Sequence, residues 1–129
     1  SNGQFKSLSM EYLLGQIFQF FAFMIGVSWS ESALVGSLLG QKFVINEFIA
    51  YVDLAQMKSD GLLSDKSIII SSYALCGFAN FSSIAIQIGG IGSLAPSRQK
   101  DLSKLGFKAL LAATLATLLT GNIAGLFMT

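Results

Sequence analysis

Three long stretches of this sequence carry no charged residue, and they limit the possible folds more than any other feature. They run from Tyr12 to Ser30, from Ser67 to Ser97 and from Ala109 to Thr129. A helix needs about 20 consecutive apolar residues to cross the hydrocarbon of a bilayer. Each stretch is close to that length or longer. The sequence therefore predicts an all-α membrane protein, with three spans as the first interpretation.

The composition favours a bilayer over water and excludes several functional classes. Hydrophobic residues make up 53% of the 129 residues and charged residues only 12%, about half the charged fraction of ordinary soluble domains. The sequence has no basic stripe that would bind nucleic acid. It has no histidine, which excludes His-based catalysis and most zinc sites. Because no nucleophile has an activating base nearby, we expect neither an enzyme nor a cofactor or metal site.

The segment from Glu31 to Met57 is apolar overall but contains charged residues, including Lys42, Glu47 and Asp53. A charge at the bilayer centre costs about 3 kcal/mol or more, so such residues usually line a cavity. Irregular backbone at that depth is tolerated only inside protein or beside water. A re-entrant helical hairpin over residues 30–55 fits both constraints. The alternative is an amphipathic helix lying on the membrane surface.

The second charge-free stretch is too long and irregular for one plain helix. Gly77, Asn80, Ser82 and Ser83 gather near its middle, where lipid would penalise polar groups. A helix broken there would turn free backbone groups toward a cavity, as in the substrate sites of secondary transporters. A continuous helix, with Ser and Asn bonded to neighbouring helices, explains the pattern equally well.

Glu47 is the ionisable residue that most clearly suggests a function. A carboxylate accepts hydrogen bonds from two vicinal hydroxyls, an amide both donates and accepts, and a serine hydroxyl does either. Glu47, Asn80 and Ser83 therefore form a chemically reasonable sugar-binding set. The aromatic residues that would close its apolar side are Phe78 and Phe81. The alternative for Glu47 is a salt bridge to Lys42 or to a residue outside this chain.

Basic residues predict the orientation of the chain in the membrane. Arg98, Lys100, Lys104 and Lys108 lie close together with only Asp101 against them. Such clusters usually face the cytoplasm. The balanced loop over residues 58–66 and the C-terminus would then lie outside.

Two pairs of small residues predict close helix packing. Gly36 and Gly40 form one small-xxx-small pair, and Gly121 and Gly125 form the other. Glycines at this spacing let the backbones of two helices approach each other.

Two motifs resemble the signatures of the concentrative nucleoside transporters. Residues 40–51 read GQKFVINEFIAY and residues 73–84 read YALCGFANFSSI, and the match continues through residues 89–98. The resemblance covers nearly the whole chain and corresponds to the C-terminal part of the family. Because the chain begins at Ser1 rather than Met, we expect it to be a piece of a longer protein.

The resemblance implies an architecture and an activity. Family members are homotrimers that take up nucleosides by alternating access, driven by a sodium or proton gradient. They are multi-pass proteins of the plasma membrane, or of the inner membrane in bacteria. This chain would hold half of an inverted repeat. The implied segments are a scaffold helix (10–28), a re-entrant hairpin (30–55), a broken transmembrane helix (66–95) and a second scaffold helix (104–128).

The resemblance also implies the substrate contacts. Glu47, Asn80 and Ser83 match the family's ribose-binding residues, and Phe78 matches a phenylalanine of the same pocket. The first hairpin, with the nucleobase contacts and the ligands of the coupling cation, is outside this chain. We therefore expect the chain to need the remainder of the transporter for activity. The alternative is a membrane structural or assembly module that does not transport.

Overall fold

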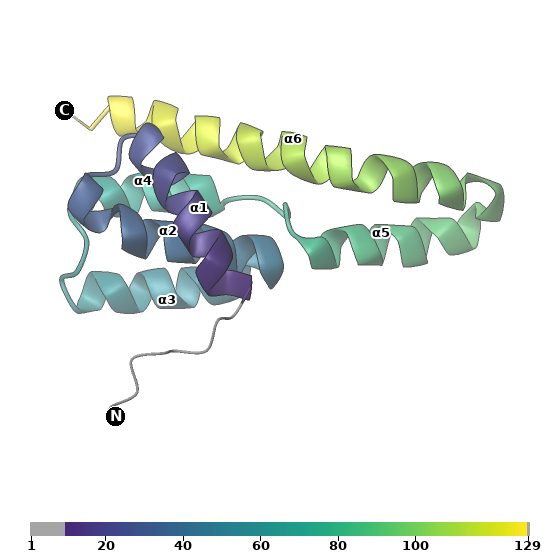
Figure 1. Cartoon of the computed structure of the whole chain (residues 1–129), viewed down its shortest axis with the longest axis horizontal. Helices are drawn as coiled ribbons and strands as arrows, with labels where there is room; N and C mark the ends of the chain where they lie inside the picture. Colours follow the sequence, from purple (N-terminus) through teal and green to yellow (C-terminus); the bar gives the residue numbers. More distant parts are fainter. Residues whose placement is uncertain (1–9, 129) are drawn as a thin grey trace.

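The structure, a computed structural model, describes residues 10–128 and is built from helices over that range, with no strand (Figure 1). In chain order the elements are α1 (Met10–Met24), α2 (Trp29–Val44), α3 (Glu47–Ser59), α4 (Asp65–Leu75), α5 (Phe81–Leu94), the short 3-10 helix η1 (Pro96–Arg98) and α6 (Gln99–Leu126). The prediction of an all-α fold is confirmed for these residues.

Four helices form a compact group, from which two others extend as an arm. In Figure 1, α1 to α4 lie together at one end of the molecule, whereas α5 and the first half of α6 run side by side away from it. Helix α6 has 28 residues and is about 42 Å long at 1.5 Å per residue. It packs against α5 along the arm and against α4 in the compact group.

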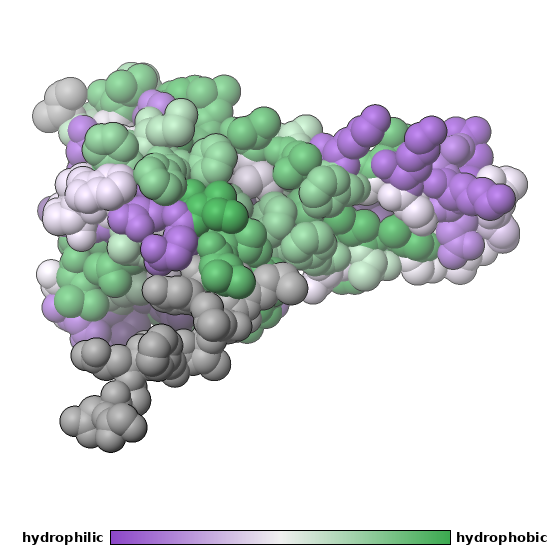
Figure 2. All heavy atoms as spheres, viewed as in Figure 1, coloured by the Kyte–Doolittle hydropathy of each residue, from purple (hydrophilic) through white to green (hydrophobic). Residues whose placement is uncertain are grey.

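Figure 2 shows a hydrophilic cap at the tip of the arm, and a compact end where hydrophilic patches lie among apolar residues. The cap lies where η1 joins α5 to α6, and its exposed cations include Arg98, Lys100 and Lys104. The connection from α3 to α4 lies at the opposite end (Figure 1). The two loops therefore lie at opposite ends of the molecule, and the prediction that they face opposite sides of a membrane stays a prediction.

Among residues 10–128, one helical stretch is long and apolar enough to cross a membrane, the 31 residues Pro96–Leu126. Within the described residues, 22% of its most apolar window is buried. Helix α1 has 15 residues, about 22 Å, and it ends before residue 28 because Gly26, with φ of 106°, turns the chain. Glycine is the residue that adopts such a φ without strain.

Helix caps explain where three of the helices begin. The side chains of Asn46, Ser64 and Asn80 each accept a hydrogen bond from a backbone N–H in the first turn of the helix that follows. Such caps satisfy donors that have no partner inside the helix. Both signature motifs therefore place an asparagine at the start of a helix.

Glu31 connects the beginnings of two helices that are distant in sequence. Its carboxylate accepts hydrogen bonds from the backbone N–H of Ser64 at 3.0 Å and from the Ser64 hydroxyl at 2.9 Å. The Ser67 hydroxyl also donates to it. The first turn of α2 is thereby held at the N-terminus of α4, where a negative charge is favourable.

Glycines allow α2 and α6 to pack closely on their neighbours, as the sequence predicted for both helices. A Cβ on Gly36 would lie 2.6 Å from the backbone N of Gln19 in α1 and 2.7 Å from the carbonyl O of Gly15. A Cβ on Gly121 would lie 2.9 Å from the carbonyl O of Ile70 in α4. At both contacts the obstacle is backbone, which cannot move aside as a flexible side chain can.

Replacing Gly36 with alanine should separate α1 from α2 and lower the apparent melting temperature of the full-length protein in detergent. We expect a loss of about 1–3 kcal/mol or more, as for other overpacked sites. Gly89→Ala is the matched control, because a Cβ there meets nothing within 4 Å and alanine favours a helix over glycine. Equal melting temperatures for the two variants would contradict this packing.

Candidate functional site

Two interruptions of helical structure meet in the fold. One lies between α2 and α3, which fold back on each other and are joined by a hydrogen bond from Gln41 Nε2 to Asp53 Oδ2 at 2.8 Å. The other covers residues 76–80, between α4 and α5. The Ser82 hydroxyl donates to the carbonyl O of Ile45 at 3.3 Å, across the two interruptions. The two signature motifs are thus brought together where the backbone of both is irregular.

We call the place where the two interruptions meet the crossing. Asn80 connects the polar residues there. Its Nδ2 donates to Glu47 Oε2 at 3.0 Å. Its Oδ1 accepts from the backbone N–H of Ser83 at 2.7 Å and from the Ser83 hydroxyl at 2.9 Å. Asn80 is only 2% exposed, whereas its partners Glu47 and Ser83 are half-buried. The structure therefore gathers three of the four predicted site residues around one amide.

The fourth predicted residue, Phe78, lies in the second interruption but does not join this group. Its side chain is 81% exposed, so residues 10–128 provide no pocket wall around it. Phe81 instead packs edge-on against Phe43 of α2, with ring centroids 5.1 Å apart. That contact holds the start of α5 against the end of α2.

Lys42 does not pair with Glu47. Its ammonium donates to the carbonyl O of Ala74 at 3.0 Å and to the hydroxyl of Thr117 at 3.1 Å. Within residues 10–128 the salt bridge that forms is between Arg98 and Asp101, both exposed. The alternative of a Lys42–Glu47 salt bridge is therefore wrong.

Gly77 explains why the chain can turn between α4 and α5. Its φ is 135°, a conformation that residues with a Cβ rarely adopt. A Cβ at this position would also lie 3.0 Å from the Cγ2 methyl of Thr117. The interruption is therefore packed directly against α6, and both its backbone conformation and its surroundings require glycine.

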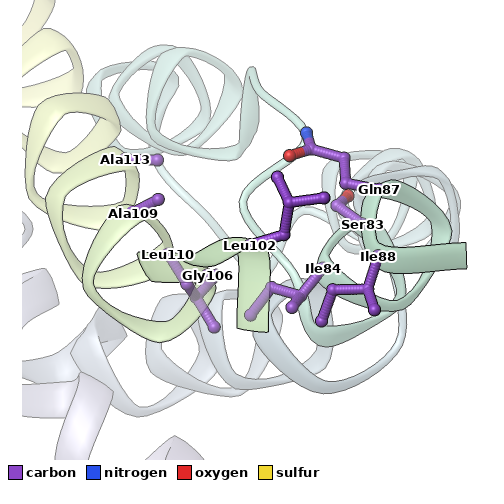
Figure 3. A pocket seen from close by; sticks show the side chains of 9 residues that line it. All are labelled: Ser83, Ile84, Gln87, Ile88, Leu102, Gly106, Ala109, Leu110 and Ala113. Carbon is purple, nitrogen blue, oxygen red and sulfur yellow. The ribbon is translucent and has the colours of Figure 1, made fainter. Parts of the chain in front are cut away.

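A small cavity lies beside this crossing, between α5 and α6 (Figure 3). Its volume is about 120 Å³, and its polar lining residues are Ser83 and Gln87, one turn apart on α5. Figure 3 shows the Gln87 amide at the rim, with Ile84 and Leu102 inside. Pockets for drug-sized ligands measure about 300–1,000 Å³. This cavity is too small to hold such a ligand alone, and it marks only the side of the site that Ser83 faces.

The crossing is suited to binding a neutral, hydroxylated ligand. Glu47 uses Oε2 for Asn80, and within the described part of the chain no hydrogen bond reaches its Oε1. That oxygen is available to accept from a ligand hydroxyl, and such charge-assisted bonds are roughly twice as strong as neutral ones. Asn80 fixes the orientation of the carboxylate by its bond to Oε2. Ser83, fixed by Asn80, adds a second hydroxyl that can donate or accept.

Sequence reasoning missed two contributions to this site. Lys42 was considered only as a salt-bridge partner, and Thr117 was not considered at all. The relevant signal for Lys42 is a lysine at the end of an apolar helix, just before an interruption. Thr117 carries no comparable signal, because only the packing of α6 brings it to the crossing.

Comparisons with known proteins agree with the two motifs. Residues 1–125 match the family described as "Na+ dependent nucleoside transporter C-terminus". The chain is 52% identical over 123 residues to the uncharacterized transporter YutK of Bacillus subtilis, covering 95% of this chain and 30% of YutK. It is 41% identical over 126 residues to the nucleoside permease NupC of Helicobacter pylori, covering 95% of this chain and 30% of NupC.

A solved structure has the same fold. The chain superimposes on CNTnw in an inward-facing substrate-bound state with a TM-score of 0.85 and 47% sequence identity, covering 93% of this chain and 30% of that one. The chain thus spans about 30% of the length of each of these three proteins.

Proposed function

The chain belongs to the Na+-dependent nucleoside transporters, matching the C-terminal part of that family, and on this premise we propose that it forms the ribose-binding half of a nucleoside transport site. The family consists of membrane transporters rather than enzymes. The whole transporter would take up nucleosides together with a cation, sodium or a proton. The nucleobase contacts and the cation ligands would be in the remainder of the protein.

The observation that carries this proposal is the hydrogen-bonded group at the crossing of the two interruptions. Asn80 holds Glu47 at 3.0 Å and Ser83 at 2.9 Å, and Glu47 keeps one carboxylate oxygen for a ligand. A ribose presents vicinal hydroxyls, which one carboxylate and its neighbours can bind together. A half-buried carboxylate that is held by a buried amide is well suited to accept those hydroxyls.

We propose that these elements lie at membrane depth. Helices α2 and α3 would form a re-entrant hairpin, and α4 and α5 would be the two halves of one broken transmembrane helix. Irregular backbone is tolerated inside a bilayer only when it is buried in protein or lines a cavity. In the interruption at residues 76–80, Gly77 packs against Thr117 of α6 and Asn80 is buried. The exposed Cys76 and Phe78 would be covered by the remainder of the transporter or line its cavity.

We propose the motion that the resemblance implies. Residues 10–28 and 104–128 would be scaffold helices, and the hairpin and the broken helix would move against them as one body during alternating access. The whole transporter would work as a homotrimer.

Uptake by the full-length protein tests the proposed function. Reconstituted into liposomes, it should accumulate radiolabelled uridine when an inward sodium or proton gradient is imposed, and liposomes given each gradient separately identify the coupling ion. Excess unlabelled uridine should compete with uptake more effectively than 3′-deoxyuridine, which lacks one ribose hydroxyl. Correctly folded protein that takes up no nucleoside under either gradient would favour the alternative, a structural or assembly module.

A further inference from the structure

Lys42 is a buried cation without an acidic partner in the described part of the chain. Its side chain is 3% exposed, and its ammonium is bound by the Ala74 carbonyl at 3.0 Å and the Thr117 hydroxyl at 3.1 Å. Burying an ammonium away from water is costly unless other groups compensate its charge. The groups that contact the ammonium here are a carbonyl in the last turn of α4 and a hydroxyl from the middle of α6, with no ion pair to a carboxylate among the described residues.

Part of the compensation comes from the C-terminal end of α4. The last carbonyls of a helix have no partner within it and carry the negative end of the helix dipole. Ala74 lies in the last turn of α4, and that turn contains no basic residue. Lys42 itself lies in the last turn of α2. The ammonium therefore lies at the negative end of α4, and the residue that carries it lies in the last turn of α2.

Glu47 has the complementary position. It lies in the first turn of α3, where the helix dipole is positive. It also accepts from Asn80, the N-cap of α5, and α5 has no acidic residue in its own first turn. Four helix ends therefore meet at the crossing. The cation Lys42 lies at the C-termini of α2 and α4, and the anion Glu47 lies at the N-termini of α3 and α5.

The contact with α6 shows that Lys42 also fixes the position of the interruption between α4 and α5. Thr117 places its methyl group against Gly77 and its hydroxyl on Lys42. The same threonine thus contacts both the interruption and the hairpin. If the ammonium were lost, the end of α2 would keep its apolar contacts but would no longer be tied to Ala74 and Thr117.

We propose that Lys42 is a positioning residue for nucleoside binding, which holds the end of α2 against α4 and α6 and thereby places Glu47 and Asn80 for the ribose. This inference rests on the proposed ribose-binding function. Lys42 does not need to touch the substrate. Its effect reaches the site through the hairpin turn, which carries Glu47 on its other side.

A double-mutant cycle in the full-length protein tests this role. Lys42→Met should weaken uridine binding, measured by calorimetry on detergent-solubilised protein, about 10-fold, the scale of a lost hydrogen bond to a charged group. In a Glu47→Gln background the same change should weaken binding much less, because the group it positions is already altered. A purely structural role predicts equal losses in both backgrounds.

Thr117→Val provides a milder second variant that is suitable if Lys42→Met does not fold. It removes one acceptor from the ammonium and keeps the methyl group against Gly77. We expect a loss of uridine affinity of about threefold, again smaller in the Glu47→Gln background. Thr120→Val is the matched control, because the exposed Thr120 hydroxyl donates only to the carbonyl of Ala116 within α6, and it should leave the affinity unchanged.

The outcomes separate this proposal from the one it rests on. If Glu47→Gln weakens uridine binding but neither Lys42→Met nor Thr117→Val does, the positioning role is wrong and the ribose site stands. Losses that are equal in the two backgrounds also overturn the positioning role. If Glu47→Gln leaves uridine binding intact, the proposed ribose site is wrong, and so is the positioning role of Lys42 that rests on it.

Discussion

Replacing Glu47 with glutamine should reduce the affinity of the full-length transporter for uridine by about 10- to 100-fold. The change keeps the shape of the side chain and an oxygen that can accept from Asn80, but it removes the negative charge. Hydrogen bonds to a charged group contribute about 1.5–3 kcal/mol each, and 1.4 kcal/mol corresponds to a tenfold change in affinity. Calorimetric titration with uridine measures the loss.

A comparison of ligands shows whether the lost affinity belongs to the ribose. The unmodified protein should bind uridine more tightly than 3′-deoxyuridine, and this preference should nearly disappear in Glu47→Gln. Asp60→Asn is a suitable control, since it makes the same acid-to-amide change at an exposed residue at the end of α3. If Glu47→Gln kept both the affinity and the preference, the carboxylate would not bind the sugar.

The second large effect is expected for Asn80→Asp, which should lower the apparent melting temperature and abolish measurable uridine binding. Aspartate is as good an N-cap as asparagine, so the start of α5 should persist. However, the Nδ2 donor 3.0 Å from Glu47 would become an oxygen acceptor. Two carboxylates at so short a distance in a buried site cannot both stay ionised without a large penalty. We expect the variant to lose about 2 kcal/mol or more of folding stability.

A double substitution shows whether the loss of stability comes from repulsion between residues 47 and 80 or from a weaker N-cap of α5. When Asn80→Asp is combined with Glu47→Gln, the amide at position 47 can donate to the carboxylate at position 80. The melting temperature should then largely recover, while the affinity for ribose stays low. Asn46→Asp is the matched control, because Asn46 caps α3 through the backbone N–H of Ile49, and it should lower the melting temperature less. An equal drop for Asn46→Asp and Asn80→Asp would show that repulsion by Glu47 is not the cause.

The charge pattern predicted the helical class correctly but not where each helix ends. Residues 104–128 were expected to form the last helix, whereas α6 begins at Gln99. The charged residues of its first turns are exposed at the tip of the arm (Figure 2), so they can be helical without entering an apolar environment. An apolar pattern locates the part of a helix that must avoid water. It does not show how far the helix continues into polar, water-exposed residues.

The site was predictable to the extent that its chemistry resides in unusual residue types. Glu47 and Asn80 were noticeable because carboxylates and amides are costly in an apolar segment. Ser83 was named because its hydroxyl can donate or accept and because it matches a residue of the family motif. The Lys42 contacts were not predictable, because the acceptor at Ala74 is a backbone carbonyl and Thr117 is 75 residues away. Every residue has a carbonyl, so sequence cannot show which one is left free at a helix end.

The charge-free stretches and the two motifs determined that this chain is helical, suited to a membrane and related to nucleoside transporters. They did so because charge and apolar length set the cost of entering lipid, residue by residue. Only the tertiary structure decided that the two interruptions meet, that Asn80 binds Glu47 and that Lys42 turns to the end of α4. Those facts depend on how α2, α4 and α6 pack, and packing is decided by close contacts such as those at Gly36, Gly77 and Gly121, between residues far apart in the chain.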